Sequence, residues 1–149
     1  EINKVTKSTP YGSVDAPLNP LLFALSSGAT FVARTYDTNP KHMQHVFSEA
    51  RKHRGLSFVE IYQNCVIFND GAHDEVLERT VRHDRLVDLV AGEKLIFGKE
   101  KDKCLVLNGL DIEVRDLADT PEEDIIVHKT DQIKPTYGLW FSSWIRWYW

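Results

Sequence analysis

The chain has 149 residues, of which 42% are hydrophobic, and a formal net charge of -4. This length and composition suit one domain with a hydrophobic core. The acidic balance argues against nonspecific nucleic-acid binding, which depends on a surplus of Lys and Arg. Two cysteines, Cys65 and Cys104, are too few for a disulfide framework, so a reducing cytoplasm is the expected setting. No apolar run approaches the roughly 20 residues that span a bilayer, and we expect no membrane-spanning segment.

The first 20 residues predict an ordered loop that leads into a short helix. Asn19 followed by Pro20 is a helix-start signal, because the Asn side chain accepts hydrogen bonds from free amides of the first turn and Pro has no amide to leave unpaired. Apolar residues between Leu21 and Leu25 give this helix a buried face, and Gly28 ends it.

The stretch 30–65 predicts a strand, a helix and a second strand. The two strands are the apolar runs 31–33 and 58–62. An Asn-Pro pair at 39–40 begins the helix, and Gly55 supplies the left-handed residue that ends it. Two strands joined by such a helix form a crossover, which implies neighbouring parallel strands with right-handed winding. We therefore expect an α/β fold with part of an open parallel sheet and flanking helices.

The rest of the chain predicts a small antiparallel β-meander. For the polar segment 72–84 two alternatives stay open, a helix that starts at Asp74 and an irregular connection. The pair Asn108-Gly109 is a hairpin signal, because both residues tolerate the positive φ of a type I′ turn. The expected strands are 85–89, 94–97, 103–107 and 111–115, with a last strand at 125–127 after an acidic loop.

A hydroxyl-rich loop near the N-terminus is the first candidate binding segment. Its members are Thr6, Lys7, Ser8 and Thr9. Such a loop could meet an anionic ligand, although a plain loop explains it equally well. The sequence has neither a Walker pattern nor G-x-G-x-x-G, so nucleotide binding is unsupported.

Asn64 and Cys65 form the second candidate, because they follow a buried strand at the sheet edge where ligands of parallel sheets collect. Cys65 could line a pocket, but packing as a partly buried residue under a loop is the simpler interpretation. A zinc site built from His42, His45, His53, Cys65 and His73 is also conceivable. The spacing matches no established zinc pattern, and the first two histidines fall on what looks like a solvated helix face, so we expect no metal site.

Two long motifs carry a specific resemblance to a known family. TKSTPYGS at 6–13 and EIYQNCVIFNDG at 60–71 resemble the C-terminal half of the beta subunit of 2-oxoacid:ferredoxin oxidoreductases, particularly the 2-oxoglutarate type. The resemblance covers about 5–128 and fails after about 136. Residues 137–149 hold all four tryptophans and are therefore expected to be a tail of doubtful origin or a packing face for a partner, with membrane-surface binding as the third alternative.

The resemblance implies that residues 1–136 are the C-terminal part of a thiamine-diphosphate-binding domain, with 1–84 as its α/β crossover region and 85–128 as the meander and last strand. It further implies oxidative decarboxylation of a 2-oxoacid to acyl-CoA, with electrons passing through an iron–sulfur cluster to ferredoxin, in a complex with an alpha subunit. Thiamine diphosphate and Mg²⁺ are held in the family by a G-D-G motif, which this chain lacks, so we expect a fragment that is inactive alone.

The residues of this chain that match positions near the family's active site can only border the cofactor pocket. They are Thr6, Lys7, Ser8, Thr9, Asn64 and Cys65. No catalytic residue is identified. The alternative is a noncatalytic α/β interaction module derived from the same scaffold.

Overall fold

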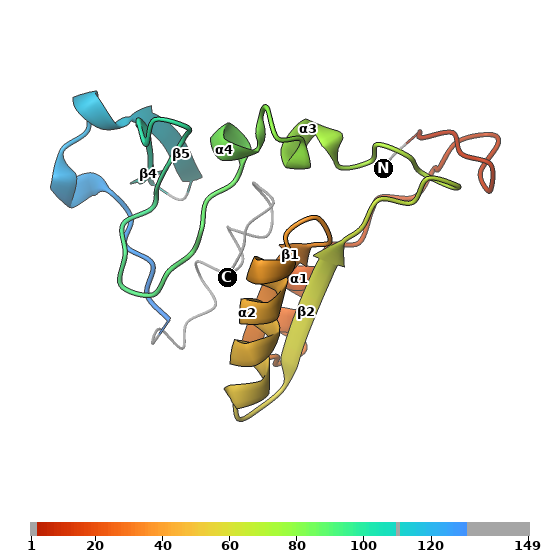
Figure 1. Cartoon of the computed structure of the whole chain (residues 1–149), viewed down its shortest axis with the longest axis horizontal. Coiled ribbons are helices and arrows are strands. Elements are labelled where there is room, and N and C mark those ends of the chain that lie inside the picture. Colours follow the sequence, from red (N-terminus) through yellow and green to blue (C-terminus); the bar gives the residue numbers. More distant parts are fainter. Residues whose placement is uncertain (1–2, 110, 131–149) are drawn as a thin grey trace.

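The computed structural model describes residues 3–109 and 111–130. Within them the chain forms an α/β unit and, further along the sequence, a small antiparallel sheet, with two short helices in the connection (Figure 1). The tryptophan-rich end lies outside the described residues. No helix in the described part of the chain is long and apolar enough to cross a membrane.

The α/β unit contains four elements in the predicted order. They are α1 (Pro20–Ser26), β1 (Phe31–Tyr36), α2 (Pro40–Lys52) and β2 (Ser57–Tyr62). Both helices begin as the sequence predicts: Asn19 Oδ1 accepts from the amide of Leu22 at 3.0 Å, and Asn39 Oδ1 accepts from the amide of His42 at 3.2 Å. Local capping chemistry therefore determines where these helices begin.

The end of α2 differs from the prediction. The helix ends at Lys52 with His53 as its C-cap, in extended conformation. Gly55 has a φ of +151° and lies in the turn that leads to β2, where an added Cβ would collide with the Thr30 hydroxyl. Position 55 therefore requires glycine because the turn approaches Thr30 closely, and not because the helix ends there.

β1 and β2 are parallel neighbours, as predicted, in a register that runs from Phe31 opposite Ser57 to Tyr36 opposite Tyr62. Helices cover both faces of this pair. On one face α1 packs through a cluster that includes Val32 of β1, whereas on the other face Ser57 Oγ donates to a backbone carbonyl of α2 at 3.1 Å. This arrangement, helix on sheet on helix, is characteristic of parallel sheets.

The segment 72–84 contains the single-turn helix α3 (Asp74–Leu77) and most of a second one, α4 (Arg82–Arg85). The helix predicted to start at Asp74 is therefore present, although it is only four residues long. The strand predicted at 85–89 is wrong, because Arg85 closes α4 and the residues after it form no strand with a described neighbour.

The antiparallel sheet has the order β3 (Ile96–Phe97), β4 (Lys103–Asn108), β5 (Asp111–Asp116). Asn108 pairs with Asp111 and is the last residue of β4, so it does not lie in the turn as predicted. The expected strand at 125–127 is reduced to isolated bridges, in which Val127 pairs with Lys94 and Ile125 with Val106. Before it come the 3₁₀ turns η1 (Leu117–Asp119) and η2 (Glu122–Asp124).

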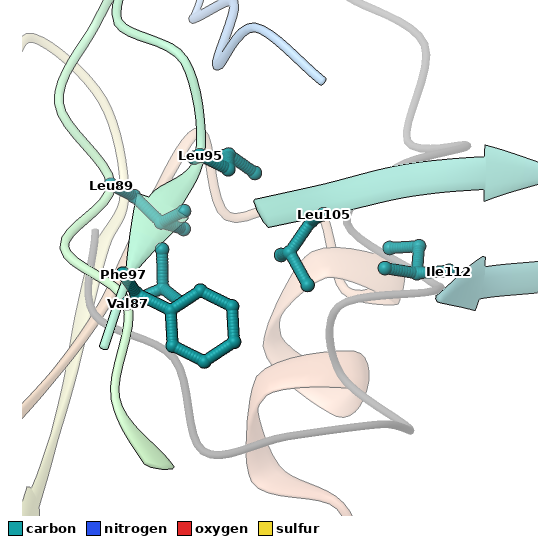
Figure 2. Packing of buried hydrophobic residues seen from close by; sticks show 6 residues of the cluster. All are labelled: Val87, Leu89, Leu95, Phe97, Leu105 and Ile112. Atoms are coloured by element: carbon teal, nitrogen blue, oxygen red, sulfur yellow. The ribbon is translucent and has the colours of Figure 1, made fainter. Parts of the chain in front are cut away.

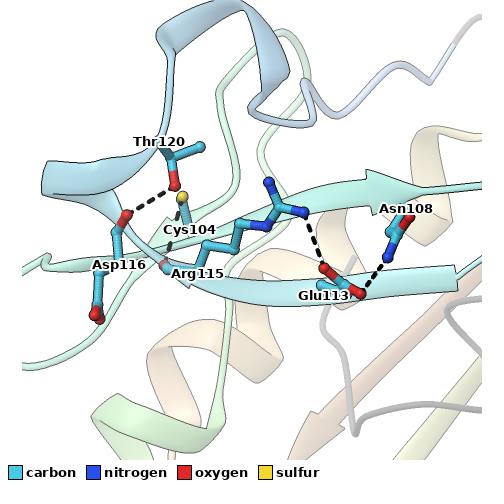
Figure 3. A network of polar contacts seen from close by, with 6 residues as sticks. All are labelled: Cys104, Asn108, Glu113, Arg115, Asp116 and Thr120. Atoms are coloured by element: carbon cyan, nitrogen blue, oxygen red, sulfur yellow. Dashed lines mark hydrogen bonds and ion pairs between the residues drawn. The ribbon is translucent and has the colours of Figure 1, made fainter.

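Each part has its own buried cluster. Figure 2 shows the one of the antiparallel sheet, formed by Val87, Leu89, Leu95, Phe97, Leu105 and Ile112. A polar network on the same sheet joins β5 to the turn after it: Thr120 Oγ1 donates to the carbonyl of Asp116 at 2.7 Å, and the buried Cys104 thiol donates to the carbonyl of Arg115 at 3.6 Å (Figure 3). The antiparallel part thus has a hydrophobic core and satisfied polar groups of its own.

Candidate functional site

The carboxyl end of β2 carries a cluster of charged and aromatic side chains. Arg34 lies opposite Glu60 in the parallel register, and its Nε donates to Glu60 Oε2 at 2.6 Å. The guanidinium carbon lies 4.7 Å from the centroid of the Tyr62 ring, which in turn stacks on His73 with centroids 4.4 Å apart and planes 4° from parallel. The cluster ties the end of the strand to the segment that leads into α3.

The turn after β2 is closed by one asparagine. Asn64 Nδ2 donates to Asp70 Oδ1 at 2.8 Å, and Asn64 Oδ1 accepts from the amide of Gly71 at 3.0 Å. Inside this clamp, Cys65 and Asn69 form an antiparallel bridge, with the Asn69 amide donating to the Cys65 carbonyl at 2.9 Å. Asn64 therefore positions the loop, and its side-chain groups already have partners within the chain.

Cys65 is exposed, contrary to the expectation of partial burial. Its thiol pKa is lowered, chiefly because the backbone amide of Phe68 donates to the sulfur, with a smaller contribution from Ile67; Asp70 opposes the shift. Hydrogen bonds to a thiolate favour the charged form, which is the nucleophilic and metal-binding form of cysteine. The turn thus favours the thiolate form of an accessible cysteine.

The predicted N-terminal loop folds on itself. Thr6 and Thr9 exchange backbone hydrogen bonds at 3.3 and 3.1 Å, and their hydroxyl oxygens are 2.7 Å apart. Ser8 Oγ lies 3.1 Å from Thr6 Oγ1, while Lys7 is exposed. The structure therefore presents a compact hydroxyl turn beside the exposed Lys7, and no hydrogen bond between described residues joins this turn to the one that holds Cys65.

The histidines of α2 are not equivalent, and the expectation that both face solvent is wrong. His42 Nδ1 lies 2.9 Å from the Thr35 hydroxyl at the end of β1. Burial lowers the pKa of His42, and the carboxylate of Asp88 partly opposes this shift. His45 is exposed. In the described part of the chain no group of three or more His, Cys, Asp or Glu side chains could hold a metal ion.

Sequence reasoning missed the Arg34, Glu60, Tyr62 and His73 cluster. A signal for part of it was present, because opposite charges at matching positions of two neighbouring strands pair across a sheet. It also missed Asn69, whose buried Oδ1 has no hydrogen-bond partner among the described residues.

Curated proteins similar to this chain are subunits of oxidoreductases. The 2-oxoglutarate oxidoreductase subunit KorB of Mycobacterium tuberculosis is 41% identical over 142 residues, which cover 95% of this chain and 38% of that protein. The beta subunit of 2-oxoacid:ferredoxin oxidoreductase from Saccharolobus solfataricus is 38% identical over 51% of this chain and 25% of its own length. The chain thus spans about two fifths or less of these relatives. No family model matches the chain.

A solved structure also shows a likeness. It is a 2-oxoglutarate:ferredoxin oxidoreductase from Magnetococcus marinus with 2-oxoglutarate, coenzyme A and succinyl-CoA bound. The match is 29% identical, has a TM-score of 0.49, and covers 60% of this chain and 29% of that chain. A likeness at this TM-score does not establish a shared fold.

Proposed function

We propose that the chain is part of the beta subunit of a 2-oxoacid:ferredoxin oxidoreductase that acts on 2-oxoglutarate. The observation that carries the proposal is the 41% identity to KorB of Mycobacterium tuberculosis over 95% of this chain. The proposed reaction is oxidative decarboxylation of the 2-oxoacid to an acyl-CoA, with ferredoxin as electron acceptor. An alpha subunit completes the enzyme, an iron–sulfur cluster in the complex relays electrons, and the setting is the cytoplasm.

Thiamine diphosphate supplies the electron sink for decarboxylation when it is bound. The described residues do not fit its diphosphate and Mg²⁺ by themselves, because they contain no cluster of carboxylate, His or Cys donors and the sequence has no G-D-G. The hydroxyls of Thr6 and Thr9 are also bonded to each other. The proposal therefore assigns to this chain only the border of the cofactor pocket and expects the chain alone to be inactive.

A chimera tests this function. Residues 5–128 replace the matching segment of Mycobacterium tuberculosis KorB, the chimera is co-expressed with the alpha subunit, and reduction of a viologen dye is followed with 2-oxoglutarate and coenzyme A. The proposal expects turnover that requires both compounds. A chimera that assembles with the alpha subunit at normal yield but shows no turnover would contradict it and favour the second candidate, a noncatalytic interaction module.

A further inference from the structure

The end of β4 carries a chemically reactive pair of residues, Asn108 and Gly109. It is the single Asn-Gly pair of the sequence, and both residues are exposed. Gly109 has a φ of +63°, and a Cβ added to it would point into open space. Because glycine has no side chain, nothing on this residue shields its amide nitrogen from the side chain of the asparagine before it.

The amide nitrogen of Gly109 can attack the side-chain carbonyl carbon of Asn108. A bond forms between that nitrogen and Cγ, the bond between Cγ and Nδ2 breaks, and ammonia leaves with the proton that the backbone amide gives up. Water then opens the cyclic imide at either of its carbonyls, which leaves aspartate or isoaspartate at position 108. The sum of these steps consumes a water molecule and releases ammonia. The reaction is intramolecular, so proximity of the two groups favours it.

The amide of Gly109 is available for this attack. It donates no backbone hydrogen bond to a described residue, and Asn108 is the last residue of β4, paired with Asp111 at the end of the ladder. The backbone of Asn108 has to rotate out of the strand conformation before the nitrogen reaches Cγ. At the end of a ladder this rotation breaks the terminal pair alone, and frayed ends open at the lowest free energy in a structure.

The chemically related pair Asp70-Gly71 is closed in the structure. The amide of Gly71 donates to Asn64 Oδ1 at 3.0 Å, and Asp70 Oδ1 accepts from Asn64 Nδ2 at 2.8 Å. The same side chain therefore holds both the attacking amide and the carboxylate that it would attack. The sequence alone would indicate both pairs, whereas the hydrogen bonds close the pair at 70–71 and leave the pair at 108–109 open.

A carboxylate at position 108 would lie beside other negative charges. Asn108 Nδ2 donates to Glu113 Oε1 at 2.5 Å, and the guanidinium of Arg115 donates to Glu113 Oε2 at 3.1 Å (Figure 3). Asp111 lies opposite position 108 in the register. Deamidation thus replaces a hydrogen-bond donor by an acceptor next to Glu113 and places like charges opposite each other on paired strands, which is destabilising.

We propose that Asn108 is a site of spontaneous deamidation and that its conversion loosens the open end of the β4–β5 hairpin. The effect is a change of charge that accumulates with the age of the chain. The inference does not rest on the proposed function, because none of these residues belongs to the candidate functional site.

Mass spectrometry of peptides from the aged wild-type chain tests the site. After incubation at neutral and alkaline pH, the mass change from amide to carboxyl is expected at Asn108, faster than at Asn64 or Asn69. Its rate should rise with pH, because the attacking nitrogen must lose its proton. A methyltransferase specific for isoaspartate should label the same peptide and leave the peptide with Asp70 unlabelled. An Asn108 amide that lasts as long as that of Asn64, or isoaspartate at position 70 instead, would overturn the proposal.

Two variants test the consequence for the hairpin. Asn108→Asp introduces the carboxylate of the product, whereas the matched control Asn108→Gln keeps an amide whose longer side chain forms a cyclic imide far less readily. In urea titrations Asn108→Asp should raise the unfolding equilibrium constant about three- to tenfold. Asn108→Gln should raise it less and should abolish the mass change at position 108. Equal stability of wild type and Asn108→Asp would overturn the proposed loosening.

The aged wild-type chain keeps the proposal testable if both variants fail to fold. Ion exchange separates the deamidated chain from the unmodified chain by its added negative charge, and the two fractions are then unfolded in urea. The deamidated fraction is expected to unfold at lower urea concentration, and coincident unfolding curves would overturn the proposed loosening.

Discussion

The ion pair between Arg34 and Glu60 allows a quantitative test of how the carboxyl end of β2 is held. The Arg34 side chain is 6% exposed and that of Glu60 18%, with 2.6 Å between Nε and Oε2. Replacing Glu60 by Leu leaves the guanidinium buried without its counter-charge. Breaking a buried pair in this way costs about 3–5 kcal/mol. Because Glu60 keeps some contact with water, we expect the lower end, about 3 kcal/mol.

The double variant Arg34→Met with Glu60→Leu separates this cost from simple loss of an attraction. When both charges are replaced by apolar groups of similar size, the stability of a buried pair is often restored, and we expect the double variant to lie within about 1 kcal/mol of wild type. The measurement is urea unfolding of the chain followed by circular dichroism. A double variant as unstable as Glu60→Leu, or a single variant with unchanged stability, would refute the reasoning.

Three further predictions follow from burial and pKa. Leu105 is 0% exposed, and Leu105→Ala should lower the free energy of unfolding by about 2–5 kcal/mol. Leu107 on the same strand is 38% exposed, so Leu107→Ala should lower it clearly less. Equal losses of stability in urea titrations would contradict the packing of Leu105 shown in Figure 2. The rate at which iodoacetamide modifies Cys65 should rise with pH around a midpoint below that of an ordinary thiol. The buried Cys104 should resist modification in the folded chain. Mass spectrometry of peptides distinguishes the two cysteines. Burial lowers the pKa of His128, so as the pH falls the unfolded chain binds a proton before the folded chain does. The free energy of unfolding should therefore decline below about pH 6.5. The variant His128→Gln should reduce this decline, and thermal melts at several pH values would detect or exclude it.

The helix starts could be predicted from the sequence because they depend on adjacent residues. An Asn-Pro pair carries both the side-chain acceptor and the missing amide, and the structure uses Asn19 and Asn39 in this way. The parallel pairing of β1 and β2 also followed from local features, since a helix of this length between two strands leaves few other connections.

The strands of the antiparallel part were less predictable, because apolar residues there are buried without forming long ladders. Val87 and Leu89 enter the core from a segment without a described strand partner, and Ile125 joins the sheet through a single bridge to Val106. An apolar run indicates burial, but only the neighbouring segments decide whether its backbone is paired. The exposure of Cys65 was missed for a related reason, since the Asn64 clamp depends on contacts six and seven residues away.

The contrast between β1 and β2 shows what composition alone could not decide. In β1 every residue from Val32 to Tyr36 is buried, whereas no residue of β2 is, although both strands are rich in β-branched and aromatic side chains. Both have helices on their two faces, so the difference is not due to missing layers. A strand with β propensity along its whole length and intermediate burial is one whose apolar surface exceeds what its present neighbours cover. Among the described residues each of the two strands has one neighbour, so strand pairing does not explain the difference either, and only the packing of side chains from other segments decides which strand is buried.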